Sequence, residues 1–302
     1  AARGRPKLNG KTFVADNGNR LRGPFDSTEW TNAAPSANFA ALKNLGFNAV
    51  HLYAENFDTT LAAGNRAAQV DLAVKYAAEN DLYIIIALAN GGKNGDYSLS
   101  YAEAFWKFYA PRYASQTHVL YEIQNEPVSW GPPYNSATAK PTGAINLQVQ
   151  AYKIIRQYAP QTPVLFFSYS VLGYGGNAAA ILGDIKALNT QIHGNANAKW
   201  TNEAVAFHGY GGVSNTKTVI SGLLSEGYPA IMTEFGTVNN AIDTSFVSTL
   251  EGLGVSWLDF QGIKTNDVST YVLTASLYET PVKNAKLCWP SDFGTFPCNE
   301  KA

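Results

Sequence analysis

The chain has 302 residues, of which 46% are hydrophobic and only 15% are charged, and its formal net charge is −1. A nearly neutral chain without a basic stripe excludes nucleic acid as the expected partner, and no apolar run reaches the ~20 residues that span a membrane. Because a barrel of alternating strands and helices takes about 250 residues, we expect one domain over 1–302 with short extensions.

Strand-like and helix-like segments alternate along the chain after a short N-terminal turn or hairpin over 8–20. Apolar, β-favouring runs predict eight strands: 21–25, 47–53, 82–88, 118–126, 164–170, 204–210, 230–234 and 255–260. Hydrophobic periodicity, with capping and stop residues, predicts the helices between them: 36–45, 65–80, 100–113, 144–158, 177–188, 216–226, 243–253 and 269–278.

This alternation predicts parallel strands that are joined by crossover helices. Eight strands within about 260 residues predict a closed (β/α)8 TIM barrel, which is an α/β fold. An open doubly wound sheet is the alternative, and we do not favour it because no glycine-rich phosphate-binding turn follows the first strand.

The two cysteines, Cys288 and Cys298, lie near the end of the chain. We expect a disulfide between them that braces the tail 281–302 in an oxidising compartment, and two free thiols are the alternative. Neither cysteine has the His or Cys neighbours that a zinc site needs, and the four histidines of the chain show no metal-ligand spacing, so the sequence predicts no metal.

Two glutamates end predicted strands. The run 118–127 reads HVLYEIQNEP and ends at Pro127, which cannot donate to a sheet ladder. Glu126 therefore stands at the carboxyl end of a strand, where barrels of this kind carry their chemistry. Glu234 ends the apolar run 230–234 in the same way. Two carboxyl groups at one edge are what glycoside hydrolysis requires.

At these positions the chain resembles the clan A glycoside hydrolases, most closely family 5, which holds many cellulases and mannanases. Four motifs carry the resemblance, in the family's order: VLYEIQNEP (119–127), FHGY (207–210), TEFG (233–236) and SWLD (256–259). The resemblance implies one catalytic barrel domain that cleaves a β-linked glycan by double displacement with retention, without cofactor or metal.

The resemblance also implies roles for single residues. Glu126 is expected to be the acid/base, because it follows Asn125, and Glu234 is expected to be the nucleophile. Asn125 would hydrogen-bond the sugar 2-hydroxyl, an interaction that strengthens in the transition state. Unrelated surface glutamates and an ordinary turn asparagine are the alternatives.

Further residues of the implied site are polar or aromatic. Tyr210 would hydrogen-bond the nucleophile, His208 would contact Glu126 or a sugar hydroxyl, and Trp257 would be the platform under the cleaved sugar. Ordinary core packing is the alternative for each. Candidate sugar platforms on loops at the barrel mouth are Trp30, Tyr53, Trp130 and Tyr134, with packing at the rim as the alternative.

Two positions depart from the family pattern. Family 5 members usually carry Arg at the end of the second strand and His at the end of the third, where this chain has His51 and Asn90. Arginine is always charged and grips a carboxylate with two parallel hydrogen bonds, which histidine does not reliably do. We therefore expect the support of Glu234 to be rebuilt by His51 together with Glu55 or Asn90.

The residues before Glu126 are more similar to cellulases than to mannanases, which favours a β-glucan substrate, with mannan as the alternative. A transglycosylase would share the covalent intermediate, and a carbohydrate-binding barrel without turnover is the alternative from another class. We expect a secreted, extracellular monomer whose partner is a β-glycan polysaccharide or oligosaccharide, with no nucleic-acid or membrane partner.

Overall fold

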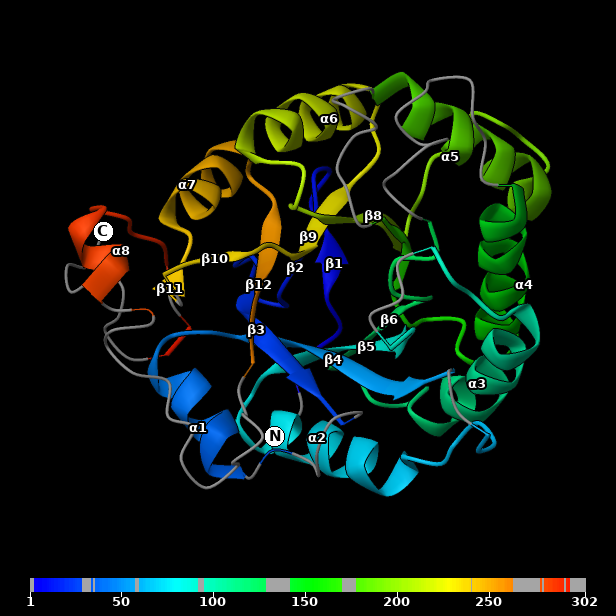
Figure 1. Ribbon diagram of the computed structural model, residues 1–302, viewed down its shortest axis with the longest axis horizontal. Helices are drawn as coiled ribbons and strands as arrows, with labels where there is room; N and C mark the ends of the chain where they lie inside the picture. The colour runs from blue at the N-terminus through cyan, green and yellow to red at the C-terminus, as the bar shows by residue number, and fades with distance from the viewer. Residues whose placement is uncertain are drawn as a thin grey trace.

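The computed structural model describes residues 3–28, 34, 36–57, 60–91, 95–128, 142–169, 178–239, 241–262, 278, 280–290 and 292–293. Eight parallel strands form a closed barrel, and helices surround it (Figure 1). The order around the barrel is β12-β3-β4-β5-β6-β7-β8-β9, so each barrel strand pairs with the next barrel strand along the chain and the last pairs with the first. The predicted (β/α)8 barrel is confirmed, and the open doubly wound sheet is wrong.

Each barrel strand lies on a segment that the sequence predicts as a strand. The strands are β3 Arg22–Ser27, β4 Ala49–Asn56, β5 Tyr83–Ala89, β6 Val119–Glu122, β7 Val164–Tyr169, β8 Glu203–His208, β9 Ala230–Glu234 and β12 Ser256–Gly262. Only β6 ends well before its predicted bound, because residues beyond Glu122 leave the ladder on their way to Pro127.

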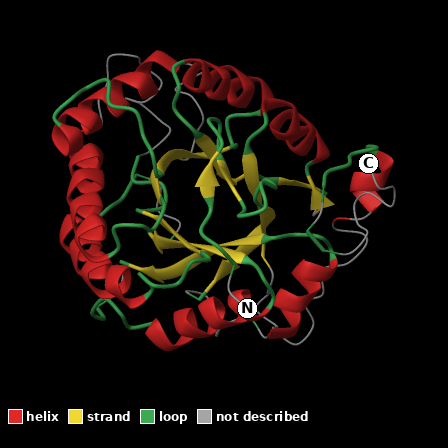
Figure 2. Cartoon of the chain, turned by 180° about the vertical axis from the view of Figure 1, so that it is seen from behind, coloured by secondary structure: helices red, strands yellow, loops and turns green. Residues whose placement is uncertain are grey.

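The helices form the outer ring (Figure 2). They are α1 Ser36–Asn44, α2 Ala67–Glu79, α3 Leu99–Arg112, α4 Thr142–Tyr158, α5 Ala178–His193, α6 Val213–Ser225, α7 Thr244–Leu253 and α8 Thr280–Asn284. α5 continues beyond its predicted end at 188, and the short α8 was not predicted. Of the helix predicted over 269–278, only Tyr278 lies within the described residues.

Two small hairpins flank the barrel. β1 Lys7–Leu8 pairs with β2 Phe13–Val14, which confirms the predicted N-terminal hairpin. Phe13 packs with Leu120 and Leu258 inside the barrel, so this hairpin closes its lower end, and Figure 1 shows it within the ring of strands. β10 Thr237–Val238 and β11 Ala241–Ile242 form a second hairpin directly after β9, which was not predicted.

Side chains alternate between the barrel interior and the helix layer along each strand. In β6, Leu120 packs inside the barrel, whereas Val119 and Tyr121 pack against the helices.

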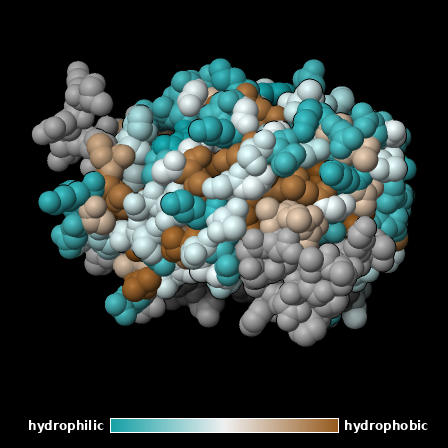
Figure 3. All heavy atoms as spheres, turned by 90° about the horizontal axis from the view of Figure 1, so that it is seen from above, coloured by the Kyte–Doolittle hydropathy of each residue, from teal (hydrophilic) through white to brown (hydrophobic). Residues whose placement is uncertain are grey.

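Figure 3 shows the side of the molecule on which α6 lies, where hydrophilic and hydrophobic residues are interspersed. Within the described part of the chain, no helix is long and apolar enough to cross a membrane.

A buried carboxylate ties the end of the chain to the lower face of the barrel. Asp292 accepts hydrogen bonds from Arg3, from Asn17 and Asn19, and from Asn48 at 3.2 Å. Burial would raise the pKa of Asp292, but these donors outweigh it and lower the pKa. The tie is therefore present at neutral pH and is lost as the pH falls through the lowered pKa.

The disulfide predicted for the tail involves Cys298, which lies outside the described residues, so the pairing with Cys288 stays a prediction.

Gly23 occupies a place in β3 where no side chain fits. A Cβ atom there would lie 1.6 Å from the carbonyl oxygen of Ala49 in β4. We expect Gly23→Ala to push the two strands apart and to lower the free energy of unfolding by about 3 kcal/mol, measured by chemical denaturation. Gly252→Ala is the matched control, because a Cβ on that helical glycine meets nothing within 4 Å. Equal unfolding midpoints for the two variants would contradict this account.

Candidate active site

The two glutamates predicted as catalytic face the same histidine at the carboxyl end of the barrel. Glu126 follows β6 and Glu234 is the last residue of β9. His208 Nδ1 lies 3.2 Å from Glu126 Oε2, and His208 Nε2 lies 3.4 Å from Glu234 Oε2. The barrel thus brings two carboxyl groups from distant parts of the sequence to opposite nitrogens of one imidazole.

The backbone around Glu126 is held in a strained conformation. Its φ angle is 43°, in the left-handed region that non-glycine residues rarely adopt. Its N–H donates to Ser168 O at 3.0 Å, and its carbonyl accepts from Gly95 N at 3.0 Å and from Asn90 Nδ2 at 3.3 Å. Strain of this kind persists only where surrounding contacts enforce it, and here it fixes the direction of the Glu126 side chain.

Two phenols donate to the carboxylate of Glu234. Tyr210 OH donates to Oε1 at 2.9 Å, and Tyr53 OH donates to Oε2. Burial raises the pKa of both tyrosines and the charge on Glu234 raises it further, so both hydroxyls keep their protons. Hydrogen bonds to the charged form favour that form, so the two phenols favour the ionised state of Glu234.

The charges of the two carboxyl groups and of His208 shift the pKa values of Glu234 and His208. Burial would lower the pKa of His208, but Glu234, Glu122 and Glu126 raise it well above its ordinary value, so the ring is an imidazolium. Burial raises the pKa of Glu234 and the Glu126 carboxylate adds to this, while His208 opposes both. Like charges on neighbouring carboxyl groups oppose ionisation, which is why the Glu126 carboxylate contributes to the raised pKa of Glu234.

Sequence reasoning missed a third buried carboxylate beneath this pair. Glu122 is fully buried, and its Oε2 lies 2.6 Å from His51 Nε2. Its Oε1 accepts from Thr233 OH at 3.1 Å and from Ser168 OH. Burial would raise the pKa of Glu122, but His51 and His208 outweigh it and lower the pKa, so Glu122 is ionised. The alternation of side chains along the strand could have placed Glu122 inside the barrel, because Leu120 faces the interior and Glu122 is two residues further on.

A β-bulge in β7 delivers Ser168 to this cluster. Phe167 and Ser168 have φ angles of 79° and 46°, and the pairing with β8 shifts register between Phe167 and Tyr169. The bulge turns the Ser168 hydroxyl towards Glu122 and its carbonyl towards Glu126. Gln148 of α4 accepts from the Phe167 N–H at 3.1 Å and so satisfies a backbone donor at the bulge.

The support that replaces the family arginine differs from the prediction. His51 pairs with Glu122, so the prediction that it would pair with Glu55 is wrong. Glu55 points out of the barrel, where it accepts from Tyr101 OH at 2.7 Å and from Gly64 N at 2.9 Å. The reason is a register shift between Tyr53 and Glu55, which reverses the alternation along β4.

Tyr53, which the sequence predicts as a sugar platform, contacts the predicted nucleophile, Glu234, directly. Its hydroxyl contacts Glu234 Oε2 and lies 2.9 Å from Asn125 Oδ1. Asn125 Nδ2 in turn donates to Asn90 Oδ1 at 3.2 Å, so the other predicted partner, Asn90, does lie in the site.

Trp257 is not a sugar platform. It is fully buried in the helix layer, where its indole Nε1 donates to Glu251 Oε1 at 2.9 Å and its ring lies 5.6 Å from that of Trp289. Alternation along β12 instead turns Phe260 inward, 4.5 Å from the ring of Phe25. The other predicted platforms Trp30, Trp130 and Tyr134 lie outside the described residues.

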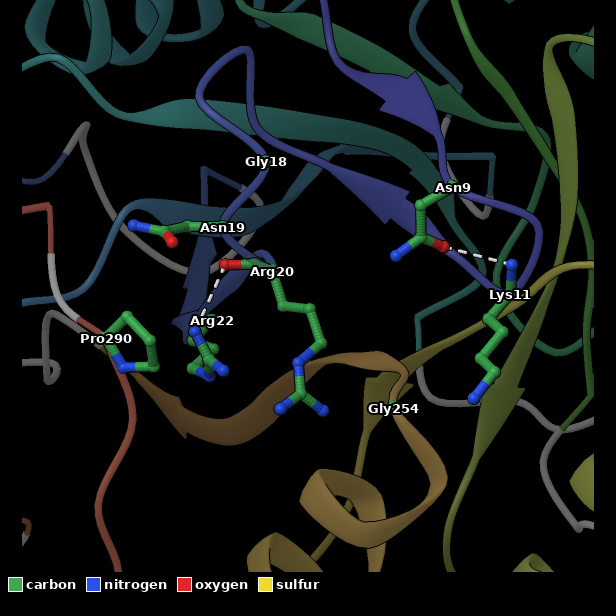
Figure 4. Close-up of a pocket in the computed structure, with 8 residues that line it drawn as sticks. All are labelled: Asn9, Lys11, Gly18, Asn19, Arg20, Arg22, Gly254 and Pro290. Carbon is green, nitrogen blue, oxygen red and sulfur yellow. Dashed lines mark hydrogen bonds between the residues drawn. The ribbon is translucent and has the colours of Figure 1, made fainter. Parts of the chain in front are cut away.

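A cavity of about 360 Å³ lies at the amino ends of the strands, opposite the carboxyl pair (Figure 4). Arg20 and Arg22 in its wall both pair with Glu251, at 2.5 Å and 2.7 Å, and so belong to an ion-pair cluster that holds the start of β3 against α7. This cavity is therefore part of the barrel's lower closure and not of the candidate site.

Within the described ranges, no group of three His, Cys, Asp or Glu side chains is placed to hold a metal ion.

Residues 11–271 match a family model, Cellulase (glycosyl hydrolase family 5). Among solved structures, Cellulase Cel5C_n is similar, with 19% identity and a TM-score of 0.66 over 97% of this chain and 94% of that chain. The catalytic domain of Thermobifida fusca endoglucanase Cel5A has 20% identity and a TM-score of 0.63 over 96% of this chain and 93% of that chain.

The β-mannanase of Thermomonospora fusca, in complex with mannohexaose, is also similar, with 16% identity and a TM-score of 0.63 over 89% of this chain and 88% of that chain. A comparison with curated proteins finds no match. At these identities the solved structures support the fold, and the family follows from the family model, which spans most of the sequence. The chain belongs to glycosyl hydrolase family 5.

Proposed function

We propose that this protein is a secreted, monomeric β-glucanase that cleaves its substrate by double displacement with retention. The observation that carries the proposal is the unequal hydrogen bonding of the two carboxyl groups beside His208. Glu234 accepts from two phenols, which favour its negative charge. Glu126 has no phenol donor among the described contacts, so we assign to it the proton that the first step requires.

In the first step, Glu126 donates its proton to the glycosidic oxygen while a Glu234 oxygen attacks the anomeric carbon. The bond between that carbon and the glycosidic oxygen breaks, and the leaving sugar departs with the proton. The product is a glycosyl ester on Glu234. The His208 imidazolium lies beside both carboxyl groups and stabilises the negative charge that develops on Glu126.

In the second step, the Glu126 carboxylate removes a proton from water, and the water oxygen attacks the anomeric carbon. The ester bond to Glu234 breaks, and its electron pair returns to the carboxylate. Two displacements on the same carbon give net retention. Asn125 is linked to Glu234 through the hydroxyl of Tyr53, and we infer that it binds the sugar 2-hydroxyl in both transition states.

Three considerations support a β-glucan and secretion. The motif at 119–127 is more similar to cellulases than to mannanases. A weakly charged chain suits a neutral polymer, and a bond between Cys288 and Cys298 would suit an oxidising compartment. Mannan is the second candidate, because the same acid/base and nucleophile would cleave it.

A glycan panel tests the proposal. Wild type, Glu234→Gln and the surface control Glu226→Gln are each incubated with β-1,4-, β-1,3-, β-1,6- and mixed-linkage glucan and with mannan, and products are sized by chromatography. We expect wild type and the control to cleave at least one β-glucan and Glu234→Gln to cleave none. Cleavage of mannan alone would favour the mannanase, and products longer than the substrate would favour the transglycosylase. No turnover at all would favour the binding protein.

A further inference from the structure

The hydroxyl of Tyr53 faces two acceptors but has one proton to donate. It contacts Glu234 Oε2 and lies 2.9 Å from Asn125 Oδ1. Tyr53 is buried, and both burial and the neighbouring charge on Glu234 raise its pKa, so it stays a neutral phenol. A phenol donates one hydrogen bond at a time, so one of the two acceptors is always left without it.

The orientation of the Asn125 amide is fixed from its other side. The carbonyl of Glu126 can only accept, so Asn90 must present Nδ2 to it, at 3.3 Å. Asn90 Oδ1 then accepts from Asn125 Nδ2 at 3.2 Å, which leaves Asn125 Oδ1 facing Tyr53. A continuous chain of hydrogen-bonding groups thus joins the side chain of Glu234 to the backbone of Glu126.

We propose that Tyr53 is a positioning residue whose hydroxyl changes acceptor during the reaction, donating to Glu234 while that carboxyl is ionised and to Asn125 while it is esterified. The inference rests on the proposed double displacement. An ionised carboxylate is the stronger acceptor, so it takes the proton in the free enzyme. Attack on the anomeric carbon removes that charge, and the Asn125 amide oxygen is then a better acceptor than the ester.

This change of acceptor means that the Tyr53 hydroxyl affects the rates of the two steps differently. In the covalent intermediate the hydroxyl orients Asn125 and therefore the contact with the sugar 2-hydroxyl. As the ester bond breaks, negative charge returns to Glu234 and the hydroxyl turns back to it. Tyr53→Phe should therefore slow the second step more than the first, and part of that loss should depend on the sugar 2-hydroxyl.

The test uses 2,4-dinitrophenyl β-glycosides and their 2-deoxy counterparts, in the gluco or manno series according to which one wild type cleaves. Dinitrophenolate leaves without a proton, so the second step limits turnover and the first appears as a burst. We expect Tyr53→Phe to keep a burst of one equivalent while kcat falls by about ten- to hundred-fold. The loss in kcat should be several-fold smaller on the 2-deoxy substrate.

Tyr210→Phe is the matched control, because Tyr210 also donates to Glu234, at 2.9 Å, but no contact with Asn125 is described for it. Its loss in kcat should be equal on the two substrates. Equal losses for Tyr53→Phe as well would overturn the inference and leave the proposed function standing. A wild type without any burst would instead count against the covalent mechanism.

Neutron diffraction tests the same point in wild type and needs no variant to fold. The Tyr53 proton should point to Glu234 in the free enzyme and to Asn125 in the enzyme trapped with a 2-fluoro sugar. The same proton position in both states would overturn the inference.

Discussion

Glu126→Ala and Glu234→Ala are both expected to lose glycan hydrolysis, but azide should rescue them with opposite stereochemistry. Loss of general acid–base catalysis at Glu126 should cost about 10²- to 10⁴-fold in kcat/KM. Loss of the nucleophile at Glu234 removes the covalent step, and the fall should be at least about 10⁴-fold. The two losses are the largest that we expect from any single change.

The leaving group and the added anion separate the two roles. Dinitrophenolate needs no proton, so Glu126→Ala should still form the intermediate from an activated substrate, and azide, which needs no base, should then release a β-glycosyl azide. In Glu234→Ala, azide can fill the space of the missing carboxylate and attack directly, which gives an α-glycosyl azide. NMR of the azide products reads the configuration. The α product from Glu126→Ala would reverse our assignment of the two residues.

Glu122→Gln is expected to be the most destabilising change within the site. Glu122 is fully buried and ion-paired with His51 at 2.6 Å. Removing one partner of a buried pair should lower the free energy of unfolding by about 3 to 5 kcal/mol. Denaturant unfolding near pH 6 measures the loss. Glu226→Gln removes the same charge from an exposed position and should cost less than about 0.5 kcal/mol.

The pH dependence of this loss has a defined sign. Glu122 has a lowered folded pKa, so its contribution is present above its unfolded pKa of about 4.3 and is lost as the pH falls. His208 has a raised folded pKa, so its contribution is full below its unfolded pKa of about 6.5 and is lost as the pH rises through the raised value. Glu122 is one of the groups that raise the pKa of His208, so its removal makes the His208 contribution to stability smaller.

The difference in the free energy of unfolding between wild type and Glu122→Gln should therefore be largest between about pH 5 and pH 7, and it should become smaller at lower and at higher pH. A gap that stays constant from pH 4 to pH 9 would show that the loss comes from packing rather than from charge.

The barrel could be predicted because its strands are buried on both faces and read as continuous apolar runs. β9 Ala230–Glu234 has the predicted bounds, and β5 Tyr83–Ala89 differs by one residue at each end. The β10–β11 hairpin could not be predicted in this way, because its two-residue strands are too short to show a period.

Residues at strand ends were also predictable, because parallel strands in a closed barrel end at the same face. Glu126, Glu234 and Asn125 all follow apolar runs, and the structure gathers them around His208 and Tyr53. Alternation, applied strictly, would also have placed Glu122 inside and Trp257 outside.

The remaining misses arise from bulges, which depend on contacts between distant segments. Glu55 turns outward because β4 shifts register after Tyr53, and Ser168 turns inward because β7 is bulged at Phe167. Gln148 on α4 supplies an acceptor at that bulge, and no local sequence pattern near Phe167 predicts this contact.

The most direct test of the account is the identity of the residue that carries the sugar. The enzyme is treated with dinitrophenyl 2-deoxy-2-fluoro β-glycosides of the gluco and manno series, which form the ester faster than it hydrolyses, and the labelled peptide is identified by mass spectrometry. We expect one glycosyl group per chain on Glu234, and no label in Glu234→Gln. A label on another residue, or turnover of a glycan with inversion and no label, would contradict it.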